Sequence, residues 1–168
     1  MPLRLVFLHG LESGPHGSKF HTLSGLGLGE VLAPDCTGLL DVQARLEVVT
    51  AALPAPDRYV LVGSSFGGLM AVLFAAAQPT RVAGLVLLAP AVHVPERVAL
   101  PRVAAALAVQ VLHGDADDIV PLAAVQLFCA NNGLPLTVVA DGHRLAQSHG
   151  VMAALVHQVW QSAQAAAV

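Results

Sequence analysis

Residues 60–70 read Val60-Leu61-Val62-Gly63-Ser64-Ser65-Phe66-Gly67-Gly68-Leu69-Met70, which places the pattern Gly-x-Ser-x-Gly between an apolar run and a helix-forming run. The pattern predicts a strand that turns sharply into a helix, with Ser65 at the tip of the turn. Glycine at positions 63 and 67 lets the chain pass close to its neighbours, where a Cβ atom would clash. The serine hydroxyl then projects above the sheet, and the N–H group of Phe66 faces the same space. This nucleophile elbow favours attack by an activated serine on a carbonyl carbon.

The sequence on either side of the pattern decides how it is interpreted, because a tight turn of small residues could carry the same five letters without any chemistry. Residues 59–62 are typical of a buried strand, and residues 69–77 are typical of a helix without a breaking residue. A strand before the serine and a helix after it favour the elbow.

Apolar strand-like runs alternate with helix-like segments along the whole chain. The predicted strands are residues 3–8, 30–33, 59–62, 82–88, 109–113 and 136–140. The predicted helices are residues 19–26, 41–53, 65–77, 121–130 and 147–165, with Asp41 as a cap and Pro121 in a first turn. Alternation with short connections predicts an α/β fold with a mostly parallel sheet of about six strands and helices on both faces.

Composition narrows the class of protein further. We interpret the chain as one domain, 1–168, because 168 residues are enough for one sizeable core. Of these residues 55% are hydrophobic, and the mean hydropathy is +0.69. The apolar runs are too short to span a membrane, and no signal segment is read at the amino terminus. The single lysine and the net charge of −3 give no reason to expect a nucleic acid partner. Cys36 and Cys129 lie far apart, which indicates a reducing, cytoplasmic setting.

A serine becomes nucleophilic when a histidine takes its proton and a carboxylate orients that histidine. In a parallel sheet such partners come from loops at the carboxyl ends of later strands. Three aspartates, at positions 115, 117 and 118, follow the strand at 109–113, and His143 follows the last strand. The chain order of serine, acid and histidine is the one expected for this kind of site.

At these residues the chain resembles the α/β-hydrolase superfamily, from residue 3 to about residue 160. The family commonly carries HGxxDxxVP, read here from His113 to Pro121, and the resemblance implies Asp117 as the triad acid; spacing alone leaves Asp115 and Asp118 open. A Gly-His pair after the last strand implies His143 as the base. The other candidate bases are His149 and His157, both in the last helical segment. The spacing of His143 and His149 matches no compact metal site.

The resemblance also implies an oxyanion hole, which needs two backbone N–H donors. The N–H of Phe66 is one, and the HG-x loop of His9 and Gly10 makes the N–H of Leu11 the other, with His9 in a structural role. The opening LHGLESGPHGSK is similar to that of the YqiA-like esterases, with departures at Glu12 and His16. It lacks the Gly-Lys-Ser/Thr of a nucleotide-binding loop.

About twenty residues separate the strand at 82–88 from the next one, which leaves no room for a cap domain. We therefore expect an open or half-covered site. Its expected walls are Gly10, Leu11, Phe66, His93, Val94, Val120 and Leu145. This apolar lining favours short or medium acyl chains, and the sequence shows no basic cluster that would mark a phosphorylated substrate.

The leading hypothesis is a serine hydrolase that cleaves carboxylic esters through Ser65, His143 and Asp117, without cofactor or metal. A thioesterase would use the same residues, whereas a peptidase would need a segment that holds a peptide strand. A non-catalytic small-molecule binder on the same fold is the main alternative, although it would not need an intact triad. A protein-interaction module would show a large exposed apolar patch. A chain this apolar and poor in lysine could form a homodimer.

Overall fold

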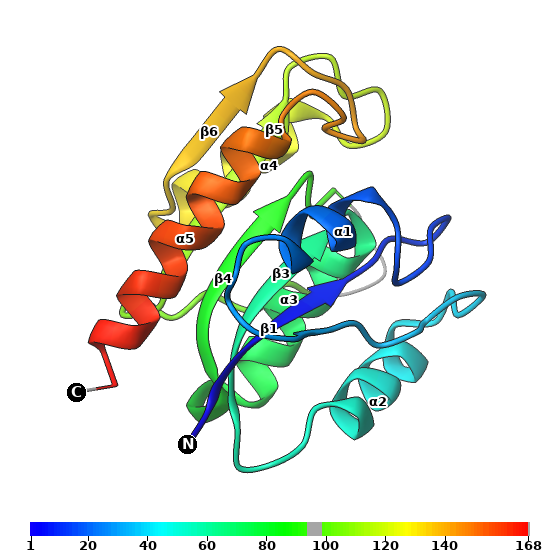
Figure 1. Cartoon of the computed structure of the whole chain (residues 1–168). Helices are drawn as coiled ribbons and strands as arrows, with labels where there is room; N and C mark the ends of the chain where they lie inside the picture. Colours follow the sequence, from blue (N-terminus) through cyan, green and yellow to red (C-terminus); the bar gives the residue numbers. More distant parts are fainter. Residues whose placement is uncertain (94–98, 168) are drawn as a thin grey trace.

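A parallel six-stranded sheet forms the centre of the computed structural model, which describes residues 1–93 and 99–167 (Figure 1). The strands lie in the order β2-β1-β3-β4-β5-β6. Their bounds are β1 Leu3–Leu8, β2 Val31–Leu32, β3 Arg58–Ser64, β4 Val82–Leu88, β5 Ala108–Gly114 and β6 Leu136–Val139. Every neighbouring pair is parallel, so the six carboxyl ends meet at one edge of the sheet.

Helices cover both faces of this sheet, as the apolar strand sequences require. They are α1 Ser18–Ser24, α2 Val42–Ala52, α3 Phe66–Ala77, α4 Leu122–Asn132 and α5 His149–Ala165, with a short 3₁₀ turn at Pro79–Arg81. The core has two parts. One packs α2, α3 and α4 against one face of the sheet, and the other packs α1 and α5 against the opposite face. Alternate residues of β1 enter each part, as in Val6 and Phe7.

The α/β fold with six strands, predicted from the alternation of segments, is confirmed. Asp41 caps α2 by accepting a hydrogen bond from the N–H of Ala44 at 2.9 Å, and Gly133 ends α4 in a left-handed conformation. The described residues between β4 and β5 form no helix or strand. No helix in the described part of the chain is long and apolar enough to cross a membrane.

Candidate active site

The turn from β3 into α3 places Ser65 in a backbone conformation that residues with side chains rarely adopt, with φ 55° and ψ −115°. Hydrogen bonds on both sides hold this conformation: the Ser65 N–H donates to the Leu88 carbonyl at 2.9 Å, and the Ser65 carbonyl accepts from the N–H of Ala91 at 2.9 Å. A Cβ atom on Gly67 would overlap the Leu8 carbonyl oxygen, and one on Gly63 would overlap the Gly67 carbonyl oxygen. The close approach expected of the two glycines is confirmed.

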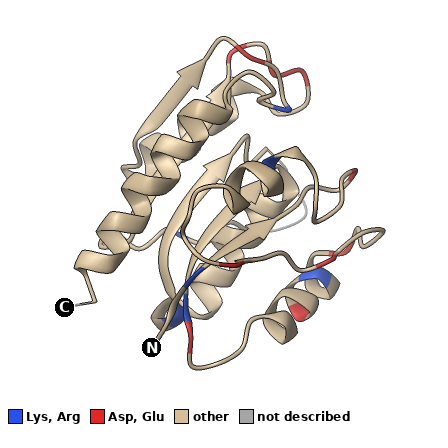
Figure 2. Cartoon of the chain, in the orientation of Figure 1, with Lys and Arg blue, Asp and Glu red and all other residues tan. Residues whose placement is uncertain are grey.

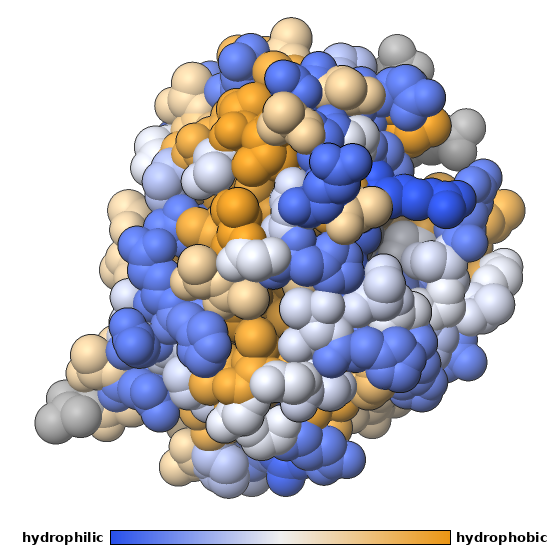
Figure 3. All heavy atoms as spheres, turned by 45° about the horizontal axis from the view of Figure 1, so that its top comes forward, coloured by the Kyte–Doolittle hydropathy of each residue, from blue (hydrophilic) through white to orange (hydrophobic). Residues whose placement is uncertain are grey.

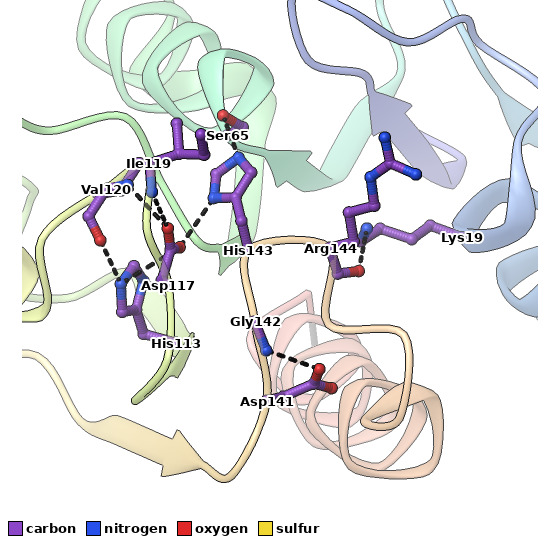
Figure 4. Close-up of polar contacts among 10 residues, drawn as sticks. All are labelled: Lys19, Ser65, His113, Asp117, Ile119, Val120, Asp141, Gly142, His143 and Arg144. Carbon is purple, nitrogen blue, oxygen red and sulfur yellow. Dashed lines mark hydrogen bonds and ion pairs between the residues drawn. The ribbon is translucent and has the colours of Figure 1, made fainter.

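Three side chains from three strand ends meet at this turn (Figure 4). His143 follows β6, and its Nε2 lies 3.0 Å from the Ser65 Oγ. Its Nδ1 lies 2.8 Å from Oδ2 of Asp117, which follows β5. A carboxylate can only accept, so the Nδ1–H donates to Asp117, and Nε2 is left to accept the proton of the serine hydroxyl. This is the tautomer that a general base for Ser65 needs.

Asp117 is held by more than one donor. Its side chain is fully buried, and its Oδ1 accepts from the N–H groups of Ile119 and Val120, both at 2.8 Å. Burial would raise the pKa of Asp117, but the hydrogen bonds from His143 and these two N–H groups outweigh it and bring the pKa below its usual range. The carboxylate is therefore ionised near neutral pH.

A second histidine, His113, lies behind this carboxylate. It is completely buried, and its Nε2–H donates to the Val120 carbonyl at 2.9 Å, with Oδ2 of Asp117 3.4 Å away (Figure 4). It therefore supports both the acid and the turn that donates to it. The sequence pattern contained His113 but did not indicate this contact.

The other candidate residues lie apart from the serine. Asp115 and Asp118 are exposed. The Nδ1 of His149 lies 2.6 Å from the hydroxyl of Thr22, which joins α5 to α1, and His157 is half-buried in α5. Within the described residues no three His, Cys, Asp or Glu side chains are arranged so that they could hold a metal ion. The geometry selects Asp117 and His143 from the alternatives that spacing left open.

The loop after β1 faces the serine from the neighbouring strand. His9 is buried, its Nε2 accepts from the N–H of Cys36 at 2.9 Å, and its Nδ1–H donates to the Gly10 carbonyl at 2.8 Å. Burial lowers the pKa of His9, which is consistent with this neutral form. Leu11, 39% exposed, lies on the cavity beside Ser65. Phe66 is the first residue of α3, so its N–H has no partner within the helix.

Arg45 fixes the same loop from α2, and the sequence analysis missed it. Its side chain donates to the carbonyls of Leu39, His9 and Gly10 at 2.7, 2.9 and 3.0 Å. The guanidinium also lies over the Phe66 ring, 5.1 Å from the ring centre. Arg45 thus ties together both segments from which the oxyanion donors are expected. A helix pattern read from apolar positions assigns an arginine to the solvent side, which is why it was overlooked.

A cavity of about 600 Å³ opens beside the three side chains, but its walls differ from those expected. Gly10 and Leu11 do line it. Val120 and Leu145 are buried in the core instead, while Phe66 and His93 are not among its walls, and Val94 lies outside the described residues. The actual walls come largely from the loop after β1 and the start of α1, namely Gly10, Leu11, Glu12, Ser13, Gly14, Gly17, Ser18 and Lys19. The others are Phe7 of β1, Ser64, Ser65, Ile119, His143, Arg144 and Ala146.

Two of these walls are cationic, which corrects the expectation that no basic cluster marks the site. Figure 2 shows one basic position on α1 and another on the loop between β6 and α5. They are Lys19 and Arg144, which are 125 residues apart in the sequence. Because they belong to different segments, no local pattern could have indicated that they share a cavity. Figure 3 shows the molecule with the top of Figure 1 turned forward. Hydrophilic side chains gather on the right-hand part of this face, and a stripe of apolar side chains lies to their left.

Comparison with known proteins gives matches to hydrolases. The sequence model of the family described as serine aminopeptidase, S33, matches residues 37–112, which include β3, Ser65 and α3. The lipase LipV of Mycobacterium tuberculosis is 36% identical over 102 residues. The match covers 54% of this chain and 38% of the lipase, so the chain matches well under half of that protein's length.

Solved structures are similar over nearly the whole chain. A hydrolase of the α/β superfamily from Xanthomonas campestris pv. campestris is 29% identical, with a TM-score of 0.79 and coverage of 95% of this chain and 97% of that one. A serine hydrolase without a lid, from Xanthomonas campestris, is 22% identical, with a TM-score of 0.70 and coverage of 95% and 82%. At that lower identity the likeness concerns the fold alone.

Proposed function

Because this chain is similar in sequence and fold to hydrolases of the α/β superfamily, we propose that it is a serine hydrolase of carboxylic esters with Ser65 as the nucleophile. The observation that carries the proposal is the unbroken hydrogen-bond chain from the Ser65 Oγ through His143 to the buried Asp117. A lipase among the similar proteins supports an ester substrate. Thioesters would react at the same residues.

The reaction follows from the position of each group. Nε2 of His143 takes the proton of Ser65 as the Oγ attacks the ester carbonyl, and Asp117 stabilises the imidazolium that forms. The N–H groups of Leu11 and Phe66 hold the oxyanion of the tetrahedral intermediate. His143 then protonates the departing alcohol, leaving an acyl group on Ser65. Water activated by His143 releases the acid and restores the serine.

The cavity size favours small substrates. Pockets of roughly 300–1,000 Å³ hold ligands of drug size, and this one is about 600 Å³. Its apolar walls, Phe7, Leu11 and Ile119, suit the methylene groups of a short or medium acyl chain. We expect kcat/KM for 4-nitrophenyl esters to be highest at acyl chains of about four to eight carbons and to fall for longer ones.

The decisive test is the intact mass of the protein after incubation with a fluorophosphonate, which reacts with activated serines. We expect one adduct on the wild type and on Ser64→Ala, a matched control in the same turn, and none on Ser65→Ala. Circular dichroism confirms that all three are folded. A folded wild type without an adduct would refute the proposal and favour the non-catalytic binder.

A second comparison separates an esterase from a peptidase. We expect hydrolysis of 4-nitrophenyl butyrate and much slower hydrolysis of alanine 4-nitroanilide, because the anilide needs stronger assistance to its leaving group. A higher kcat/KM for the anilide would overturn the ester assignment and leave Ser65 as the nucleophile of an aminopeptidase.

A further inference from the structure

The cavity beside Ser65 has a cationic part that the proposed reaction does not use. Lys19 is the second residue of α1, and Arg144 directly follows His143 on the loop after β6. The Nζ of Lys19 donates to the backbone carbonyl of Arg144 at 2.7 Å, which places the two residues on the same part of the wall (Figure 4). Both therefore border the space that a substrate bound at Ser65 would enter.

The charges of these two side chains are not paired directly with a carboxylate of the described residues. Within residues 1–93 and 99–167, neither lies in a salt bridge with a carboxylate. The nearby Asp141 accepts instead from the Ser148 hydroxyl and the N–H of Gln147, while its other oxygen accepts from the N–H of Gly142. Glu12 lines the same cavity and is exposed. Of the charged side chains that line the cavity here, two are cations and one is an exposed carboxylate, which leaves one positive charge in excess; Asp141 does not line the cavity, but its carboxylate offsets part of the charge of Lys19.

The electrostatics of Lys19 agree with this balance. Burial lowers the pKa of Lys19, the positive charge of Arg144 lowers it further, and Asp141 offsets this in part. An anion bound between the two cations would replace lost hydration and relieve their repulsion. The guanidinium of arginine suits the two oxygens of a carboxylate or phosphate, and a lysine ammonium adds a point charge.

We propose that Lys19 and Arg144 form a subsite for an anionic group of the substrate, so that the preferred ester carries a carboxylate or a phosphate. The inference rests on the proposed ester hydrolysis at Ser65 and adds the class of substrate. It assigns to both side chains a role in specificity, apart from the bond-breaking steps. The anionic group belongs either to the acyl part or to the alcohol part of the ester.

A structural role for Lys19 must be separated from this one. Its hydrogen bond to the Arg144 carbonyl also anchors the loop that carries His143, so Lys19→Met is expected to slow every substrate to some degree. The acceptor at Arg144 is a backbone atom, and the side chain of Arg144 is exposed. Arg144→Gln therefore removes the charge and leaves that hydrogen bond in place. Arg58→Gln is the matched control, because Arg58 lies at the opposite end of β3 from Ser65.

The experiment compares kcat/KM for pairs of esters that differ in one charge. For the acyl side the pair is mono-4-nitrophenyl glutarate and 4-nitrophenyl pentanoate. For the alcohol side the pair is 4-acetoxybenzoate and its methyl ester, and 4-acetoxyphenyl phosphate replaces the carboxylate by a phosphate. In the wild type we expect the anionic member of at least one pair to be favoured about tenfold, and salt to reduce this preference.

Arg144→Gln should abolish that preference by lowering kcat/KM for the anionic member far more than for the neutral member, whereas Arg58→Gln should leave the preference unchanged. A wild type that hydrolyses both members of every pair equally, or a preference that survives in Arg144→Gln, overturns the anionic subsite. In either case turnover of the neutral ester still supports the esterase. Failure of the esterase is distinct, because then no member of any pair is hydrolysed.

Discussion

At the scale of single residues, Asp117 links the chemistry of the site to the stability of the protein. Its carboxylate is fully buried and accepts from the imidazole of His143 and from two backbone N–H groups. These partners favour the ionised form, so they stabilise the folded state while the carboxylate carries its charge. Protonation of Asp117 and loss of stability are therefore coupled.

The pH dependence of this coupling is testable. The folded pKa of Asp117 lies below its usual value, so its contribution to stability is complete above the unfolded pKa and is lost as the pH falls through the folded pKa. In urea unfolding at pH 7, Asp117→Asn should lower the free energy of unfolding by about 2 kcal/mol. The difference from the wild type should shrink below about pH 4. Asp118→Asn, at an exposed neighbour, should show little effect; a pH-independent difference for Asp117→Asn would contradict the argument.

At the scale of elements, the site depends on α2, which supplies no reacting group. Arg45 of α2 is 1% exposed and donates to three carbonyls, two of them in the loop that carries the Leu11 N–H. Replacing it removes this donor from the Leu39 and His9 carbonyls and leaves the Gly10 carbonyl with the Nδ1–H of His9 alone. A helix on one side of the sheet thus fixes the position of a loop above it.

Arg45→Met keeps the length of the side chain and removes the donors. We expect the free energy of unfolding to fall by roughly 3 kcal/mol, because charged hydrogen bonds are lost to buried acceptors. We also expect kcat to fall more than KM rises, since the oxyanion donor would be displaced from the transition state. Urea unfolding and steady-state ester hydrolysis measure the two effects. Glu47→Met, on the exposed side of the same helix, is the control; equal losses of kcat in both variants would argue against the role of Arg45.

The elements themselves could be read from the sequence more completely than the walls of the site. The six strands and five helices occur where the alternation predicted them, and β4 has the predicted bounds. The Gly-x-Ser-x-Gly turn and the HGxxDxxVP segment identified Ser65 and Asp117 because each pattern is local. Lys19, Arg45 and Arg144 act through contacts between distant segments, which periodicity does not describe. Val120 and Leu145 were assigned to the cavity from the length and polarity of their loops, yet both side chains are buried in the core.

At the scale of the whole molecule, both cysteines lie in the part of the core that packs α2, α3 and α4 on the sheet. Burial raises the pKa of the Cys129 thiol to about 11. Few molecules therefore carry a Cys129 thiolate near pH 8, and reagents reach it only when the structure opens. Its reactivity should report on the stability of the molecule as a whole.

Labelling by a disulfide reagent at about pH 8 checks this, with Cys36→Ala used to leave Cys129 as the one thiol. We expect labelling at least about a hundredfold slower than in the urea-unfolded chain. Urea below the unfolding transition should accelerate labelling in step with the fall in the free energy of unfolding. Labelling in native buffer as fast as in the unfolded chain would show that Cys129 is open to solvent.

The hydrogen-bond chain at Ser65 also constrains the order of events during refolding. Ser65 and His143 are 78 residues apart. Ser65 follows β3, Asp117 follows β5 and His143 follows β6, and in the sheet β4 lies between β3 and β5. Contacts so distant in the sequence close late, since each carries a large loss of chain entropy. The serine is thus activated only in molecules in which the part of the sheet from β3 to β6 is complete. The recovery of serine reactivity during refolding would therefore measure the fraction of fully folded molecules, because compact intermediates without the last strand would not react.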